Sequence, residues 1–450
     1  MKRIYSILLD ANSIIGRIIC GMIYIFFYDY IYENFIFGVF GYMAEVDYVP
    51  MNIATRLLWI LVSITPLLFY HRITKISTFI CLFLYLFTYI PFIHAMFITD
   101  RISPLMTYSY SLVMCIFFSL YFKLDHFSDS SSKLIFKPTI PLVVIEITTL
   151  ILTLIFIGTR ASSMHFVNIL TQQDILYDLR AQNSEKVEAQ SLILYLQGWL
   201  VGAFYPFLLV YYLRQKERIK TALIFLGYIA LFMVDMQKST FVTPFILIGM
   251  YYLLLVKEEV ICNRLHSYII LFISAISIIL YLITDIDNKI LFSIVSILLL
   301  RTICVTGWLT QMYALFFQEN PYTYYSHINI VNAITNQYPY DAPLGVAVAH
   351  GGMNANATFF LTDGLAAWGL GGIIVIGAVF LLLIYVINML SYRYKNTDLF
   401  VVFIPTVIFL LNASLFTTLL TGGLLILILI IGGAEQTAER EDIAEESSEI

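Results

Sequence analysis

Apolar runs about as long as a bilayer is thick recur along most of this chain, and they constrain its fold more than any other feature. The stretch from Ala222 to Val234, for example, carries no charged residue and is apolar on every face of a helix. Crossing a bilayer takes about 20 mostly apolar residues, and within lipid the backbone must satisfy its own hydrogen bonds. Each run is therefore predicted to be a helix, because a membrane barrel would need alternating polar and apolar residues.

Composition excludes the soluble alternatives. The 450 residues are 60% hydrophobic and 12% charged, whereas soluble domains carry about 25% charged residues. Too little polar surface is left to cover a water-soluble fold, which argues against a cytosolic enzyme, a secreted disulfide scaffold or a disordered protein. The net charge of -5 gives no indication of nucleic-acid binding. The five cysteines lie mostly in apolar runs without metal-site spacing, so we expect small buried hydrophobic residues.

We predict an all-α integral membrane protein with about 12 transmembrane helices, in which residues 1–433 form one polytopic membrane domain. Residues 434–450 are acidic and are expected to form a disordered cytoplasmic tail. The expected spans are 12–30, 51–70, 76–98, 104–122, 140–158, 191–213, 221–237, 240–256, 266–284, 365–390, 399–412 and 415–433.

The Lys and Arg residues of the loops predict the orientation. One set of alternate loops holds more than twice as many of them as the other, which places that set and both termini in the cytoplasm. Residues 290–317 are also apolar, but a span there would move the basic turn at 391–395 to the outside. We expect this segment to be helical and to lie in or dip into the outer leaflet. A chain with thirteen or fourteen spans stays open as an alternative.

Two long polar loops, about 159–190 and 285–364, are predicted on the outer face, where the protein is expected to work. Few basic residues lie on this face, and a charge at membrane depth is usually paired or lines a polar cavity. A cluster that holds an anionic group is one interpretation. For Arg160 the alternative is a side chain that snorkels to the lipid headgroups, and Asp178 could simply pair with Arg180. The candidate cations are Arg160, Arg180, Lys238 and Arg301.

His350 precedes two glycines, Gly351 and Gly352, in the second loop. Glycine allows the backbone to approach a ligand closely, and a histidine in such a turn suits a general base near neutral pH. A polar loop histidine without a chemical role is the alternative.

The layout of these residues resembles the O-antigen polymerase family, the Wzy-type glycosyltransferases of bacterial surface-polysaccharide synthesis. The resemblance covers residues 1–433 and depends on four features. These are Tyr177-Asp178-Leu179-Arg180, the Gln237-Lys238-Ser239 turn, Arg301 in an apolar outer segment, and the run 351–360 that leads through Asp363-Gly364 to Trp368-Gly369-Leu370-Gly371-Gly372.

The resemblance implies an enzyme of the bacterial inner (cytoplasmic) membrane, with a fold similar to C-type glycosyltransferases. Such an enzyme polymerises undecaprenyl-diphosphate-linked oligosaccharide repeat units into O-antigen or related surface polysaccharide at the periplasmic face. Lipid diphosphate is the leaving group, and neither a metal ion nor another cofactor is required. The implied partners are the lipid-linked donor and acceptor, membrane lipids, and a chain-length regulator and flippase.

This chemistry gives the candidate residues their expected roles. Guanidinium and ammonium groups suit the charge that develops on a departing diphosphate, so Arg180, Lys238, Arg301 and Arg160 are the diphosphate-binding candidates. His350 is the first candidate for the base that activates the acceptor hydroxyl, with Asp178 and Asp363 next. The sugar-binding candidates are Tyr324, Tyr325, Asn354 and Asn356.

Two other functions stay open. An O-antigen ligase would share the layout and the donor but pass the glycan to the lipid A core. A polysaccharide flippase or secondary transporter should carry ionisable residues inside several spans. The sequence shows them in few spans, chiefly Arg17, Asp29, Arg56 and Glu146.

Overall fold

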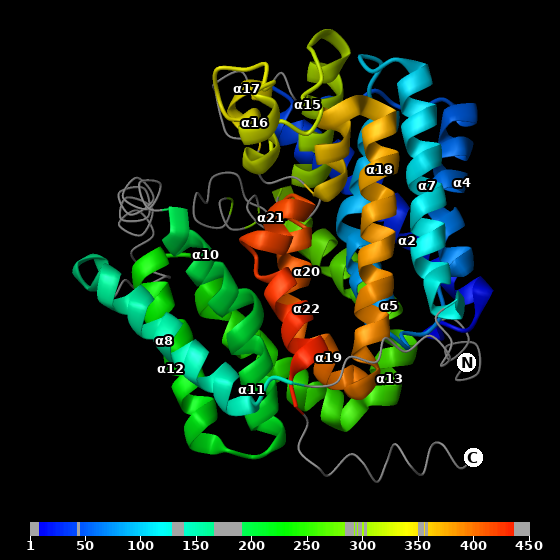
Figure 1. Cartoon of the computed structure of the whole chain (residues 1–450). Coiled ribbons are helices and arrows are strands. Elements are labelled where there is room, and N and C mark those ends of the chain that lie inside the picture. Colours follow the sequence, from blue (N-terminus) through cyan, green and yellow to red (C-terminus); the bar gives the residue numbers. More distant parts are fainter. Residues whose placement is uncertain are drawn as a thin grey trace. The chain divides into compact units, whose positions relative to one another are not determined.

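The computed structural model describes residues 9–42, 46–127, 139–165, 191–283, 304–349 and 359–435, together with a few single residues between them. This part of the chain is helical, with one isolated bridge between Ile140 and Ala434 in place of a sheet (Figure 1). Seven of its helices are long and apolar enough to cross a membrane. The protein is therefore an all-helical, multi-pass membrane protein, whereas the predicted number of twelve spans is not confirmed.

The chain forms two compact units rather than one continuous array. Unit 1 contains residues 1–129, 257–388 and 407–416, and unit 2 contains residues 130–256, 389–406 and 417–450. Each unit is thus assembled from segments that lie far apart in the sequence.

The core of unit 1 is a buried helix surrounded by other helices. It consists of α5 (Ile76–Leu84), η2 (Tyr85–Tyr89) and α6 (Ile90–Phe97), nearly every residue of which is buried. Around it pack α2 (Ile14–Ile31), α4 (Ile53–Phe69) and α7 (Pro104–Phe127).

Helix α15 (Val305–Glu319) packs along α6 and is itself largely buried. Gly307 lies against the carbonyl of Pro91, and the Gln311 side chain donates to the Ala95 carbonyl at 2.7 Å. The described part of the segment predicted at 290–317 is therefore a helix, as expected, but one that belongs to the protein interior of unit 1.

Unit 2 brings together α8 (Leu142–Arg160), α10 (Ser191–Trp199), η4 (Leu200–Phe204), α11 (Tyr205–Arg214), α12 (Arg218–Asp235) and α22 (Leu424–Gly433). Gly198 and Gly202 face the backbone of Thr421 and Gly422, so α10 and η4 meet the start of α22 without intervening side chains. Such close backbone approach requires glycine.

Two of the predicted spans, 240–256 and 266–284, lie within one assigned helix, α13 (Lys238–Ile283), which has a non-helical residue at Lys257. The division between the two units also falls there. The last two predicted spans are instead divided into short helices: α19 (Asn396–Val402), α20 (Ile404–Leu410), α21 (Leu415–Leu420) and α22. Pro405 and a left-handed Gly423 (φ 79°) interrupt these runs.

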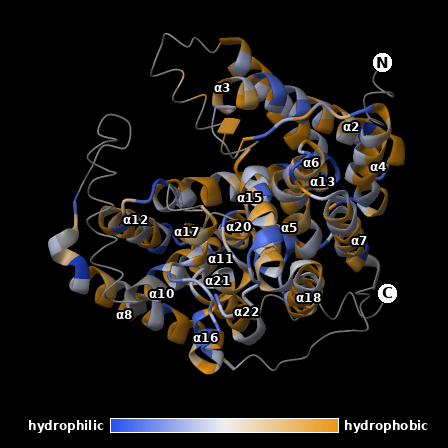
Figure 2. Cartoon of the chain, turned by 90° about the horizontal axis from the view of Figure 1, so that it is seen from above, coloured by the Kyte–Doolittle hydropathy of each residue, from blue (hydrophilic) through white to orange (hydrophobic). Residues whose placement is uncertain are grey.

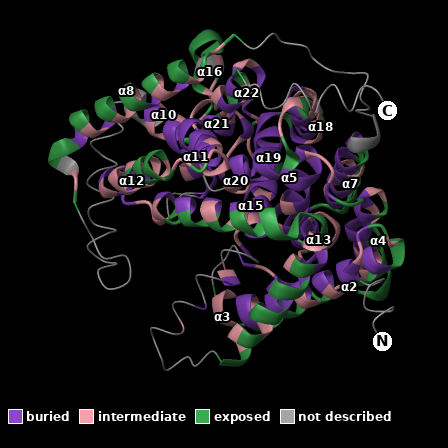
Figure 3. Ribbon diagram, turned by 90° about the horizontal axis from the view of Figure 1, so that it is seen from below, coloured by how far each residue is buried: buried purple, intermediate pink, exposed green. Residues whose placement is uncertain are grey.

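The helices leave apolar stripes uncovered. On α8, the residues Val143, Ile147, Leu150 and Leu154 recur at helical spacing and are each between 51% and 60% exposed. Figure 2 shows hydrophobic residues in orange on α8 and α4, and Figure 3 shows exposed residues in green on the same helices. Water would not favour this surface, but lipid tails would.

The glycine contact in unit 2 can be tested. A β-carbon at Gly202 would collide with the Gly422 carbonyl, so Gly202→Ala should lower stability by about 1–3 kcal/mol. A β-carbon at Gly249 in α13 would meet no atom within 4 Å, so Gly249→Ala should be neutral or slightly stabilising. Thermal unfolding in detergent measures both, and equal midpoints would contradict the close packing.

Candidate functional site

A sharply broken helix forms the centre of the candidate site in unit 1. Helix α18 (Phe360–Leu390) is interrupted at Trp368 and Gly369, which separates a short half-helix, 360–367, from the long helix that follows. The break is sharp enough that Gly364 lies against the backbone of Gly372. Gly369 has φ 55°, and a side chain there would meet the hydroxyl of Tyr322. Broken helices in membranes commonly line polar cavities.

The loop at 321–328 caps this half-helix. The backbone N–H groups of Thr323 and Tyr324 donate to the carbonyls of Ala366 and Ala367 at 2.9 and 2.8 Å. The last carbonyls of a helix have no partner within it, so the loop replaces partners that lipid could not supply. The Tyr325 hydroxyl donates to the Gly372 carbonyl at 3.1 Å, and burial raises the pKa of Tyr325 to about 12, so this donor stays protonated.

The same loop fixes the tautomer of His327. The Thr323 hydroxyl donates its only proton to the Ala366 carbonyl at 3.1 Å. The 2.8 Å contact between the Thr323 hydroxyl and His327 Nδ1 must therefore be a bond that Nδ1–H donates. Nε2 carries the lone pair, and it has no hydrogen-bond partner among the described residues. His327 is thus arranged to accept a proton.

Asp363 lies on the half-helix and faces this nitrogen. Its Oδ1 is 3.8 Å from His327 Nε2, and both side chains are less than a tenth exposed. The Ser414 side chain and the Leu415 backbone also lie close to the Asp363 carboxyl. Because burial lowers the pKa of His327 to about 4, the imidazole is neutral at pH 7. A carboxyl and a neutral imidazole at this separation can both contact one bridging hydroxyl, although the low pKa makes the imidazole a weak base.

Two exposed aromatic residues lie close in sequence to this pair. Tyr324 is 61% exposed and Trp368 is 57% exposed, and the bond from Tyr324 N–H to the Ala367 carbonyl makes them neighbours. Tyr324 and Tyr325 both have left-handed backbone angles, with φ 48° and 65°. Such strain costs about 1–3 kcal/mol per residue and is typical of functional sites.

Two of the predicted cations lie at one end of unit 2. Arg160 ends α8 and is buried, and Lys238 begins α13. The backbone N–H of His165 donates to the Met233 carbonyl at 2.9 Å, which brings the segment after α8 to the end of α12. Between α12 and α13, the Asp235 carboxylate accepts bonds from the Thr240 hydroxyl and the Gln237 backbone, so the tight turn is held rigidly.

The other predicted site residues lie outside the described residues. These are the catalytic candidates His350 and Asp178, the diphosphate candidates Arg180 and Arg301, and the sugar-binding candidates Asn354 and Asn356. Of the predicted residues that the structure does describe, Asp363, Tyr324 and Tyr325 come together in unit 1.

A second polar cluster is buried in unit 1. Asp29 on α2 accepts from Arg56 at 3.1 Å and lies 2.9 Å from His94 Nε2. His94 is fully buried, and the rings of Tyr28, Tyr32 and Trp59 surround it edge-on. Ionisable groups at such depth are usually functional or paired, and here the carboxylate is paired twice.

Comparison of the chain with protein-family models, with curated proteins and with solved structures finds no match. Its function is therefore inferred from its own residues. In the part of the chain that the structure describes, no three His, Cys, Asp or Glu side chains are grouped so that they could hold a metal ion.

His327 and Trp368 are the site residues that sequence reasoning missed as candidates. His327 is 36 positions before Asp363, and no spacing rule joins a loop residue to a half-helix at that distance. The sequence shows Trp368-Gly369 as part of a glycine-rich motif. Glycine within an apolar run is the feature that could have predicted the break in the helix.

The buried histidine should make stability depend on pH. Its pKa is about 4 in the native state and about 6.5 unfolded, so the unfolded chain binds more protons between these values. The contribution of His327 to stability should be full above pH 6.5 and should fall as the pH drops toward 4, by about 3 kcal/mol at most. Thermal unfolding of wild type and His327→Gln from about pH 7.5 to about pH 4 measures this. The variant should lose less stability over that range, and parallel curves would contradict the assignment.

Proposed function

We propose that this protein is a membrane glycosyltransferase that polymerises lipid-diphosphate-linked repeat units into a surface polysaccharide. The observation that supports this most directly is the buried Asp363–His327 pair on the half-helix and its capping loop, at the break in α18 where Trp368 is exposed. The sequence resemblance to the O-antigen polymerase family gives the substrate class. Polymerisation at the periplasmic face of the inner membrane, with both termini cytoplasmic, is part of the same proposal.

In this reaction an acceptor sugar hydroxyl attacks the anomeric carbon of the donor glycan. A new C–O bond forms, and the bond from that carbon to the lipid diphosphate breaks with its electron pair. The hydroxyl proton passes to the Asp363–His327 pair, which holds it between Oδ1 and Nε2. The proton later returns to solvent or to the departing diphosphate.

The separation of the two groups suits such a step, but His327 Nε2 is buried, so the acceptor must displace the groups that cover it. An acceptor oxygen about 2.8 Å from both His327 Nε2 and Asp363 Oδ1 forms a triangle whose base is the observed 3.8 Å. Tyr324 and Trp368 supply apolar ring faces with polar edges nearby, which suit a sugar that is apolar on its faces and polar at its rim.

The leaving group requires positive charge. Arg160, Arg180, Lys238 and Arg301 are the residues proposed to bind the diphosphate oxygens. Preorganised cations at a site poor in water lower the barrier for a departing anion without a metal ion.

Removing the proton-transfer pair should abolish polymer. His327→Ala and Asp363→Asn should each lower polymerisation by about 100-fold or more, the usual contribution of a general base. The measurement is the length distribution of surface polysaccharide on gels from cells that lack the wild-type gene. His71→Ala, an exposed histidine elsewhere in unit 1, is the matched control and should leave chain length unchanged. Long polysaccharide in either site variant, at normal protein level, would contradict the assignment.

The cation proposal has its own test. Arg180→Ala or Arg301→Ala should abolish long glycan while the protein stays inserted, and activity on purified lipid-linked units should persist in EDTA. Normal chain length in both variants would refute binding of the diphosphate by these arginines. Loss of activity in EDTA that added metal restores would instead indicate a metal-dependent reaction.

The same gel separates a polymerase from the ligase alternative. A strain without a polymerase leaves one repeat unit on the lipid A core, whereas a strain without a ligase leaves none.

Transport of the lipid-linked unit is a second candidate, and the Asp29–His94–Arg56 cluster favours it. A transporter needs ionisable groups inside its spans, and this cluster adds His94 to those seen in the sequence. For a transporter, His94→Gln should stop movement of lipid-linked units across proteoliposomes. For a polymerase, such movement should be absent from wild type as well.

A further inference from the structure

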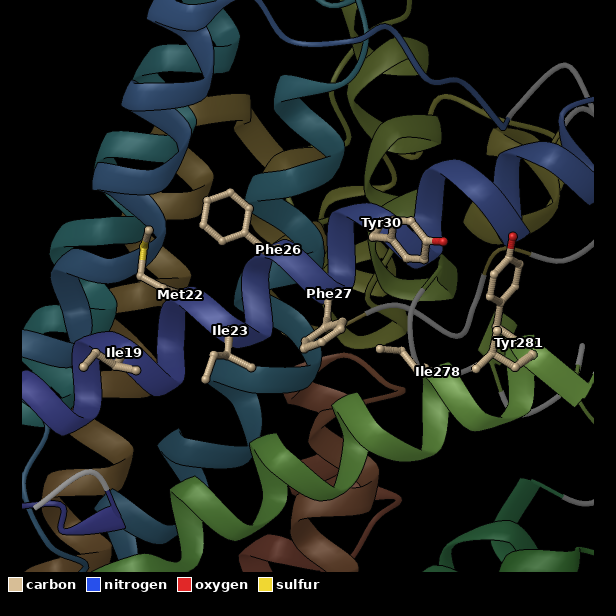
Figure 4. Close-up of a pocket in the computed structure, with 9 residues that line it drawn as sticks. Ile19, Met22, Ile23, Phe26, Phe27, Tyr30, Ile278 and Tyr281 are labelled. Atoms are coloured by element: carbon tan, nitrogen blue, oxygen red, sulfur yellow. The ribbon is translucent and has the colours of Figure 1, made fainter. Parts of the chain in front are cut away.

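A hollow of about 660 Å³ lies between α2 and the second half of α13, both within unit 1. Figure 4 shows Ile23 and Phe27 extending from α2 toward α13, and Ile278 and Tyr281 extending from α13 toward α2. Every residue that lines the hollow is apolar or aromatic. We call this hollow the α2–α13 groove.

The groove is held open at both ends. At one end, Ala11 N–H donates to the Asn263 carbonyl at 2.9 Å, and the Ser267 hydroxyl donates to the Leu9 carbonyl at 3.1 Å. At the other, Tyr30 and Tyr281 meet edge to face with their centroids 6.0 Å apart. These contacts fix the two helices at both ends, and among the described residues no side chain fills the space between them.

The groove is continuous with the lipid-facing surface. Both walls belong to helices long and apolar enough to cross a membrane. Beside the groove, Ile15 on α2 and Phe272 and Ile279 on α13 are 65%, 66% and 55% exposed. An apolar space of this kind is not a site for water, since water there would find no polar partners.

The dimensions select the occupant. From Ile19 to Tyr30 the groove follows α2 for about 16 Å at about 1.5 Å per residue. Half of the hydrocarbon core is about 15 Å thick, so the groove spans one leaflet. If a methylene group occupies about the volume of a water molecule, about 30 Å³, a chain of about sixteen carbons needs about 480 Å³ and fits. A polyprenyl chain of about fifty-five carbons would need more than twice the available volume.

The two tyrosines mark the polar end. Tyr30 is 47% exposed, and tyrosine is favoured at the level of the lipid headgroups. A lipid with its headgroup beside Tyr30 and Tyr281 would place its tail along Phe27 and Ile23 toward Ile19.

We propose that the α2–α13 groove binds one acyl chain of a membrane phospholipid. The bound chain completes the packing between α2 and α13. This site is separate from the Asp363–His327 pair and does not depend on the function proposed above.

A larger side chain in the α2–α13 groove should exclude the acyl chain. Ile278 lines the groove and is half-buried, whereas its neighbour Ile279 is exposed to the lipid side and does not line it. Delipidated protein is titrated with palmitoyl-oleoyl phosphatidylethanolamine and followed by native mass spectrometry. Wild type and Ile279→Trp should bind one phospholipid saturably, and Ile278→Trp should bind it about 10-fold more weakly or worse, since a bulky side chain would occupy the space of the acyl chain. Equal binding by the two variants, or no saturable binding by wild type, would overturn the proposal.

A second measurement uses the wild-type protein and does not require a variant to fold. A phospholipid with a photoreactive group midway along one acyl chain should label peptides that contain residues 19–30 and 278–282 preferentially. Even labelling of all lipid-facing helices would overturn the proposal. Stronger labelling of these peptides by a polyprenyl phosphate that carries the same group would overturn the choice of a phospholipid chain.

Discussion

The carbonyls of Ala366 and Ala367 depend on two backbone N–H groups from another part of the chain. A helix that ends inside a membrane domain leaves its last carbonyls without partners, and hydrocarbon supplies none. The N–H groups of Thr323 and Tyr324 meet this need. Once the loop is held there, His327 lies over the half-helix and its Nδ1 proton is fixed by Thr323. The geometry of the candidate site thus follows from a requirement of backbone hydrogen bonding.

Electrostatics in the rest of unit 1 follow a similar rule. Asp29 is buried where an isolated carboxylate would be very costly, and it is compensated by Arg56 and by His94. Unit 2 pairs Arg214 with Asp398 at 2.7 Å and Lys220 with Glu146 at 3.1 Å, although these pairs are partly exposed. Replacing one of the buried polar groups of unit 1 should therefore lower the stability more than replacing a member of these partly exposed pairs.

The sequence predicted the fold class well because length and apolarity alone decide it. Runs such as 140–158 and 104–122 became α8 and α7 almost as expected, since nothing interrupts them. The run at 399–412 did not become one helix. Pro405 and the packing of neighbouring segments divide it into α19 and α20, and a hydropathy profile shows neither effect. The division into two units was also not predictable, because it depends on which apolar faces meet.

The candidate site was predicted in part. Asp363, Tyr324 and Tyr325 were singled out from the polar composition of one loop and the glycine-rich motif that follows it. That Asp363 faces His327 could not be predicted, because their approach depends on the reversal at Gly369 and on the capping loop. Residue types indicated the chemistry, whereas the partner of each residue required the three-dimensional structure.

The contact of Gly198 and Gly202 with residues 421–422 also bears on how the protein is made. The ribosome delivers α10 and η4 to the membrane long before it synthesises α22. Until then, the glycine face of η4 has no protein partner and must be covered by lipid or by the insertion machinery. Unit 2 therefore acquires its final packing only near the end of translation. A ribosome that stalls before residue 421 would leave in the membrane a helical bundle whose Gly198–Gly202 face has no protein partner.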